Sequence, residues 1–141
     1  MSEPFSPRHL LVTGGAGFIG SAFVRYVLAR YADLHVTVLD KLTYAGNLAN
    51  LAPVAGDPRY RFVQGDITQR DDVLPVLAAC DALVNFAAET HVDRSILDAG
   101  AFVTTDVYGS YVLLEAMRER GTPRALFVST DEVYGDVPHG A

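Results

Sequence analysis

The sequence has little cysteine, a deficit of positive charge and no long apolar run. Its single cysteine, Cys80, excludes a disulfide within the chain and suits a reducing compartment. Cys80 falls in an apolar helical stretch, which favours a core position over a reactive one. Because 17 acidic residues oppose 11 lysines and arginines, the formal net charge is −6, and nucleic acid is not an expected partner. No run approaches the roughly 18 apolar residues of a membrane span, and the first residues lack an apolar signal core. We therefore expect no membrane association and a cytoplasmic protein.

The sequence does contain a glycine-rich turn between an apolar strand pattern and a helical pattern, LLVTGGAGFIG at residues 10–20. Its glycines fit two registers, Gly15-x-Gly17-x-x-Gly20 of the general dinucleotide-binding fingerprint and Gly14-x-x-Gly17-x-x-Gly20 of short-chain dehydrogenases/reductases. Such a turn offers free N–H groups and the positive end of a helix dipole to phosphates.

Asp40 supplies the second half of this signal. It closes a second apolar strand about 20 residues after the turn, where an acid binds the ribose of the adenosine. The two features together predict dinucleotide binding, and an acid at this position favours NAD over NADP. The alternative for Asp40 is a helix N-cap or a turn residue.

Alternating strand and helix patterns predict an α/β fold with a doubly wound parallel sheet. Strands are expected over 9–13, 34–40, 61–64, 82–86 and 125–129, and helices over 17–30, 48–51, 68–79 and 101–120. The usual winding gives the strand order 3-2-1-4-5.

Two of these helices carry more detailed expectations. Thr68 or Asp71 is expected to cap the helix over 68–79, and Pro75 to kink or restart it. Gly121 is expected to end the helix over 101–120. The expected buried stripe of that helix consists of Val103, Val107, Tyr111, Leu114 and Met117.

Polar clusters follow the predicted strands, at the edge of a doubly wound sheet where ligands gather. They are the glycine turn, Asp40, Asp66, residues 87–91 and residues 129–132. In the last cluster, Asp131 and Glu132 beside Thr130 suit an acid/base pair. The alternative is a solvated turn with a helix cap, which the spacing alone favours.

Five stretches cover nearly the whole chain and carry a family resemblance. They are VTGGAGFIGS (12–21), LDKLTYAGNLANLA (39–52), RYRFVQGDI (59–67), FAAETHVDRSI (86–96) and VSTDEVYGD (128–136). They resemble the nucleotide-sugar dehydratases of the extended short-chain dehydrogenase/reductase family, for which the second, fourth and fifth stretches are specific. The resemblance implies an NAD(P)-binding Rossmann fold, bound NAD, a nucleotide-activated glucose as substrate, and a homodimer for the full-length protein. It implies no metal.

The resemblance also implies roles for single residues. In a hydro-lyase that yields a 4-keto-6-deoxy sugar, Glu132 removes the C5 proton, Asp131 protonates the departing C6 hydroxyl, and Thr130 hydrogen-bonds the sugar near O4. Thr90 lies near both cofactor and substrate. The remaining cofactor contacts are Gly14, Gly17 and Gly20 in the turn, Phe18 and Ile19 at the pyrophosphate, Asp40, Lys41, Leu42 and Thr43 at the ribose, Asp66 and Ile67 at the adenine, and Phe86, Ala87, Ala88 and Thr105 along the cofactor.

Two features depart from the family pattern. Asp106 stands where the family usually has asparagine, so an acceptor is kept and an amide donor is lost. The family's Tyr-x-x-x-Lys pair, which ionises the C4 hydroxyl, does not occur, because Lys41 is the only lysine and position 37 is a threonine.

We therefore expect residues 1–8 to be a leader and residues 9–141 to be an incomplete NAD-binding domain, without the substrate domain, that binds NAD but does not turn over substrate. Two alternatives stay open. One is an epimerase or decarboxylase of the same superfamily, although epimerases generally lack the Asp131–Glu132 pair. The other is a non-catalytic NAD-binding fragment.

Overall fold

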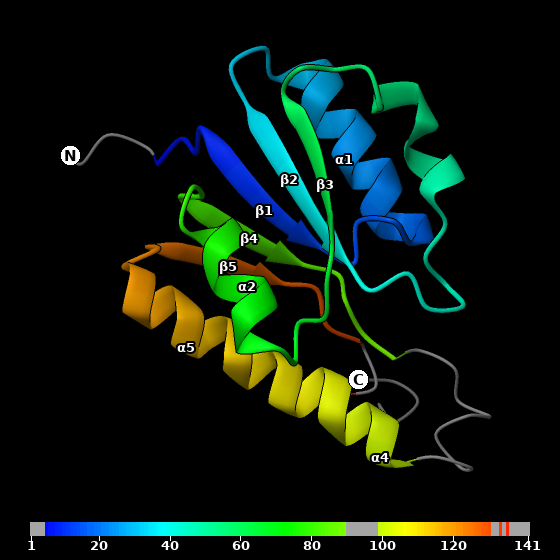
Figure 1. Cartoon of the computed structure of the whole chain (residues 1–141), viewed down its shortest axis with the longest axis vertical. Helices are drawn as coiled ribbons and strands as arrows, with labels where there is room; N and C mark the ends of the chain where they lie inside the picture. The colour runs from blue at the N-terminus through cyan, green and yellow to red at the C-terminus, as the bar shows by residue number, and fades with distance from the viewer. Residues whose placement is uncertain (1–4, 90–98, 131–132, 134, 136–141) are drawn as a thin grey trace, which may run out of the picture.

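A computed structural model of the chain describes residues 5–89, 99–130, 133 and 135. These residues form one sheet of parallel strands in the order β3-β2-β1-β4-β5 (Figure 1). The strands are β1 (His9–Thr13), β2 (His35–Asp40), β3 (Tyr60–Gln64), β4 (Ala82–Asn85) and β5 (Arg124–Phe127). The predicted fold class and strand order are confirmed, and each strand lies within two residues of its expected bounds.

Helices cover both faces of the sheet (Figure 1). On one face, α1 (Phe18–Arg30) and the 3₁₀ helix η1 (Leu48–Val54) share a core cluster with Leu10 and Val12 of β1. On the other face, α2 (Arg70–Leu77) and α5 (Ser110–Arg120) share a second cluster with Leu11. Successive side chains of a strand point to opposite faces, so a strand buried on both faces is a continuous apolar run.

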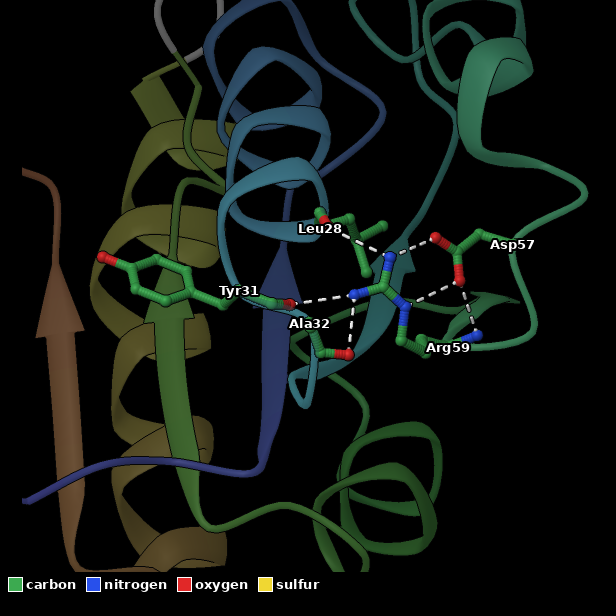
Figure 2. A network of polar contacts seen from close by, with 5 residues as sticks. All are labelled: Leu28, Tyr31, Ala32, Asp57 and Arg59. Carbon is green, nitrogen blue, oxygen red and sulfur yellow. Dashed lines mark hydrogen bonds and ion pairs between the residues drawn. The ribbon is translucent and has the colours of Figure 1, made fainter.

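The C-terminal end of α1 is held by Arg59, which directly precedes β3 (Figure 2). Its guanidinium donates to the carbonyl oxygens of Leu28, Tyr31 and Ala32 at 2.8–3.0 Å and to the carboxylate of Asp57 at 2.6 and 3.0 Å. The last carbonyls of a helix have no partner within the helix, and the planar guanidinium fork satisfies several at once. The hydrogen bond from Arg59 lowers the pKa of Asp57. This network ties α1 to the connection between η1 and β3.

Residues 99–120 form three helical segments instead of the one predicted helix. These are α4 (Ala99–Phe102), the π-helix η2 (Val103–Gly109) and α5. The predicted stripe is wrong, because only Met117 is buried, while Val103, Val107, Tyr111 and Leu114 are exposed. The face that packs toward the sheet consists of Val112, Leu113, Ala116 and Met117.

The reason is that α5 has apolar residues on more than one side, and periodicity does not say which side meets the sheet. The π-helical turn also shifts the residues before Ser110 out of phase with those after it. The end of the helix was predicted correctly, since Gly121 follows α5 with a φ of 71°.

The predicted cap of α2 is wrong. The residue that precedes the helix is Gln69, and its side chain makes no capping hydrogen bond, so neither Thr68 nor Asp71 has that role. Asp71 instead lies in the first turn, where a negative charge is favourable near the positive end of the helix dipole. Pro75 lies inside this single helix and does not restart it.

Cys80 is a core residue, as predicted. Its thiol is buried and donates to the carbonyl oxygen of Val76 at 3.2 Å. Burial raises the pKa of the thiol to about 12, so the reactive thiolate is scarce near neutral pH. In the part of the chain that the structure describes, no helix has the length and apolarity to cross a membrane.

Candidate functional site: the cleft at the carboxyl ends of the strands

The glycine turn connects β1 to α1 and packs tightly against its surroundings. Gly14 has a φ of 68°, and a Cβ there would lie 2.5 Å from the backbone nitrogen of Ala87, just after β4. A Cβ at Gly20 would lie 2.3 Å from the carbonyl oxygen of Gly14. Glycine therefore lets the turn approach the end of β4 and lets α1 begin directly against the turn.

The peptide groups on both sides of Ala16 are held by residues between the end of β2 and η1. The N–H of Ala16 donates to Asp40 Oδ2 at 2.9 Å. Its carbonyl oxygen accepts from the N–H of Asn47 and from Nδ2 of Asn50, both at 3.0 Å. The two asparagines are positioning residues for the turn that the sequence reasoning did not find. Their only signal in the sequence is that they lie in the stretch over 39–52, which carries the family resemblance.

The segment directly after β2 is also constrained. Asp40 Oδ1 accepts from the N–H of Leu42 at 2.8 Å, and Leu42 has a φ of 59°. This left-handed conformation is unusual for a residue other than glycine. The Asp40 carboxylate thus holds the glycine turn with one oxygen and the strained turn at Leu42 with the other.

Lys41 and Asp66 close the side of the site that lies beyond β2. The Lys41 ammonium lies 2.6 Å from Asp66 Oδ2, and the N–H of Thr68 donates to Asp66 Oδ1 at 2.9 Å. Burial raises the pKa of Asp66, but the hydrogen bonds from Lys41 and Thr68 lower it by more, so the net pKa lies below its ordinary value. Asp66 is therefore a charged acceptor at neutral pH.

A cleft of about 110 Å³ lies at the carboxyl edge of the sheet. Eleven of the predicted cofactor residues line it: Gly14, Gly17, Asp40, Lys41, Thr43, Asp66, Ile67, Phe86, Ala87, Ala88 and Thr105. Leu39, Ala45, Gly46 and Gly65 line it as well and were not predicted as site residues, and Glu89 lines it from the predicted polar cluster over 87–91. The volume is below the roughly 300–1,000 Å³ of a ligand pocket, so the described residues enclose only part of a site for a dinucleotide.

Other predicted residues lie outside the lining. Phe18 and Ile19 are 89% and 63% exposed in the first turn of α1, where backbone N–H groups have no partner within the helix. Gly20 is buried beneath the turn, and Leu42 packs on the core cluster under α1. Thr130 is exposed. Thr90, Asp131 and Glu132 lie outside the described residues.

The loop after β4 is linked to two other elements. The N–H of Glu89 donates to Asp106 Oδ1 of η2 at 2.9 Å, and the hydroxyl of Tyr44 donates to Glu89 Oε2 at 3.1 Å. Burial raises the pKa of Asp106, the hydrogen bond from the Glu89 N–H lowers it, and the Glu89 charge raises it, with a net increase. In the hydrogen bond from the Glu89 N–H, Asp106 is the acceptor. Among the described residues, no three His, Cys, Asp or Glu side chains are grouped to hold a metal ion.

Known proteins resemble the chain in sequence and in structure. It is 57% identical over 136 residues to a dTDP-glucose 4,6-dehydratase of Streptomyces niveus, and the match covers 94% of this chain and 40% of that protein. The structure of the Streptomyces venezuelae dTDP-glucose 4,6-dehydratase DesIV with NAD and TYD bound matches with a TM-score of 0.89 at 55% identity, covering 94% of this chain and 42% of that one.

More distant relatives share the fold. A Thermus thermophilus UDP-glucose 4-epimerase in complex with NAD matches with a TM-score of 0.82 at 34% identity, covering 94% of this chain and 41% of that one. The chain thus spans about two-fifths of the length of the relatives it matches, and the matched part is their N-terminal part. Residues 10–141 match the NAD dependent epimerase/dehydratase family, and the chain belongs to that family.

Proposed function

We propose that the cleft binds NAD and that the chain is the cofactor-binding part of a dTDP-glucose 4,6-dehydratase. The observation that carries this proposal is the identity of 41–57% to dehydratases of that name, against 29–34% to the UDP-glucose 4-epimerases. The epimerase alternative is therefore the weaker one. Bound NAD supplies a hydride acceptor that is regenerated within one catalytic cycle.

The residues of the cleft fit a dinucleotide. Glycine at positions 14, 17 and 20 leaves the turn with no side chain between the backbone and a pyrophosphate at these positions. The first-turn N–H groups of Phe18 and Ile19 are the donors for its oxygens. Asp40 has one backbone N–H on each oxygen, and a carboxylate oxygen accepts a second bond, so its acceptors remain available to ribose hydroxyls.

The remaining cofactor contacts are proposed by position along the cleft. Lys41 and Thr43, which line the cleft, surround the ribose together with Leu42 between them in sequence, whereas Asp66 and Ile67 meet the adenine. Asp66 is a charged acceptor, which suits the exocyclic amine of adenine. Phe86, Ala87, Ala88 and Thr105 border the rest of the cofactor, and Gly17 lies at the pyrophosphate.

The acid–base chemistry is assigned to the segment after β5. We propose that Glu132 takes the C5 proton while Asp131 gives a proton to the leaving C6 hydroxyl, and that Thr130 and Thr90 bind the sugar. Elimination needs a base and an acid that act together, which adjacent carboxylates provide. Support comes from the sequence position after β5, because the carboxyl ends of parallel strands meet at one edge of the sheet.

We further propose that residues 9–141 form the NAD-binding domain and that the substrate domain of such an enzyme lies in the length of the relatives beyond the match. The chain has one lysine, Lys41, and hence no Tyr-x-x-x-Lys pair to ionise the C4 hydroxyl. The 141-residue chain is therefore expected to bind NAD without converting dTDP-glucose. The whole enzyme is proposed to act as a cytoplasmic homodimer.

The test is calorimetric titration of the purified chain with NAD, with NADP as the matched ligand, followed by an assay for the 4-keto-6-deoxy product. Saturable binding of NAD, weaker binding of NADP and no product are expected. Absence of NAD binding would refute the proposed cofactor site. Product formation by this chain would refute the argument from the missing lysine.

A further inference from the structure

We propose that Tyr44 and Glu89 are positioning residues that join the two loops flanking the glycine turn and so preform the cleft for NAD. This inference rests on the proposed function of the cleft. Tyr44 belongs to the loop between β2 and η1, and Glu89 belongs to the loop after β4. The Tyr44 hydroxyl donates to Glu89 Oε2 at 3.1 Å across 45 positions of sequence.

The topology gives this bond its position. β2 and β4 are the two neighbours of β1, so the loops that follow them leave the sheet on either side of the glycine turn. Thr43, Ala45 and Gly46 line the cleft from the first loop, and Ala87, Ala88 and Glu89 line it from the second. A bond between the loops therefore fixes the distance between two walls of one cleft.

Each end of the bond is itself anchored. On the Tyr44 side, the N–H of Gly46 donates to the carbonyl oxygen of Thr43 at 3.1 Å, which closes the turn that contains Tyr44. On the other side, the N–H of Glu89 donates to Asp106 Oδ1 at 2.9 Å. The bond consequently connects the loops after β2 and β4 with η2 around the cleft.

Loss of the Tyr44–Glu89 bond is expected to weaken NAD binding more than it lowers the stability of the fold. Tyr44 is 46% exposed, and an exposed hydrogen bond contributes little to global stability because water replaces the lost partner. Two loops that are ordered only when the ligand binds make binding weaker, since their ordering reduces the net free energy of association.

The experiment is a double-mutant cycle on the 141-residue chain, with the dissociation constant for NAD and the Tm as its two readouts. Y44F removes the donor, E89A removes the acceptor, and the double variant removes both. Each is expected to raise the dissociation constant about three- to tenfold, with the double variant no worse than E89A alone. E89Q keeps an acceptor oxygen and is expected to stay within about twofold of the parent.

Y26F is the matched control, because Tyr26 is 61% exposed on α1 and does not line the cleft. It should change neither readout, and Y44F should leave the Tm unchanged. The inference is overturned if Y44F leaves the dissociation constant unchanged, if the effects of Y44F and E89A multiply in the double variant, or if Y44F lowers the Tm as a fold-stabilising contact would. A parent chain that binds no NAD refutes the proposed function itself and is recognised before any variant is made.

Discussion

Replacing glycines by alanine one at a time separates two costs in unfolding free energy that the glycine turn combines, the cost of a left-handed φ and the cost of a steric overlap. At Gly14, an added Cβ meets both a left-handed φ and backbone atoms within 2.7 Å. At Gly20, it meets only a close contact, 2.3 Å from the carbonyl oxygen of Gly14. At Gly121, it meets only a φ of 71°, with no atom within 4 Å, and at Gly56 it meets neither obstacle. The four positions therefore form a complete set of controls within one chain.

The magnitudes follow from these two obstacles. A left-handed φ costs a residue with a Cβ about 1–2 kcal/mol, and forced contacts in a packed region cost about 1–3 kcal/mol. G121A should therefore lose about 1–2 kcal/mol of unfolding free energy, and G20A about 1–3 kcal/mol. G14A should lose roughly the sum, 2–5 kcal/mol. G56A should gain about 0.4–1 kcal/mol, because alanine restricts the unfolded chain.

Urea unfolding followed by far-UV circular dichroism gives the four free energies, and titration with NAD gives the effect on the cleft. G14A and G20A should impair NAD binding, whereas G121A should lose stability and still bind, because Gly121 lies after α5 and not in the lining. The reasoning is refuted if G14A is no less stable than G121A, or if G20A behaves like G56A. Either result would mean that the turn relaxes around an added Cβ.

Three further outcomes follow from the structure. Burial and the neighbouring His35 lower the pKa of His9, so the unfolded chain binds more protons than the folded one. The contribution of His9 to the unfolding free energy should be complete above its ordinary pKa of 6.5 and should fall as the pH drops below it. If H9Q leaves the slope of unfolding free energy against pH unchanged, this prediction is contradicted. D40N places an amide NH₂ against a backbone N–H and should cost about 1–3 kcal/mol of unfolding free energy, more than D66N in parallel urea titrations. Strand β5 lies at an edge of the described sheet with Leu126 56% exposed, so sedimentation velocity should show self-association, and a monodisperse monomer would contradict this.

The strand order was predictable because buried parallel strands are continuous apolar runs. Leu10, Leu11 and Val12 are all buried, since both faces of β1 are covered by helices. The centre of the site was predictable for a related reason. Loops that follow neighbouring parallel strands meet at one edge, so Asp40 and Asp66 come together with the glycine turn wherever their strands are placed correctly.

The contacts and the helix face that could not be predicted from the sequence have two physical explanations. Contacts between residues far apart in sequence leave no local pattern, and both the Tyr44–Glu89 bond and the Asn50 bond to the Ala16 carbonyl oxygen are of this kind, with separations of 45 and 34 positions. Helix faces are ambiguous when more than one is apolar. For α5, the choice between the two faces depends on contacts with α2, and no property of the segment alone decides it.

Asp40 shows why the two halves of the dinucleotide fingerprint occur together. Its carboxylate accepts the N–H of Ala16 in the glycine turn and the N–H of Leu42 in the strained turn after β2. A Cβ at Gly46 would lie 2.8 Å from Asp40 Oδ1, so the chain returns close to the same carboxylate. These contacts are made between parts of the protein itself. The spacing of glycines and acid therefore serves the fold of the turn, and ribose recognition uses the acceptor capacity that those contacts leave on the same two oxygens.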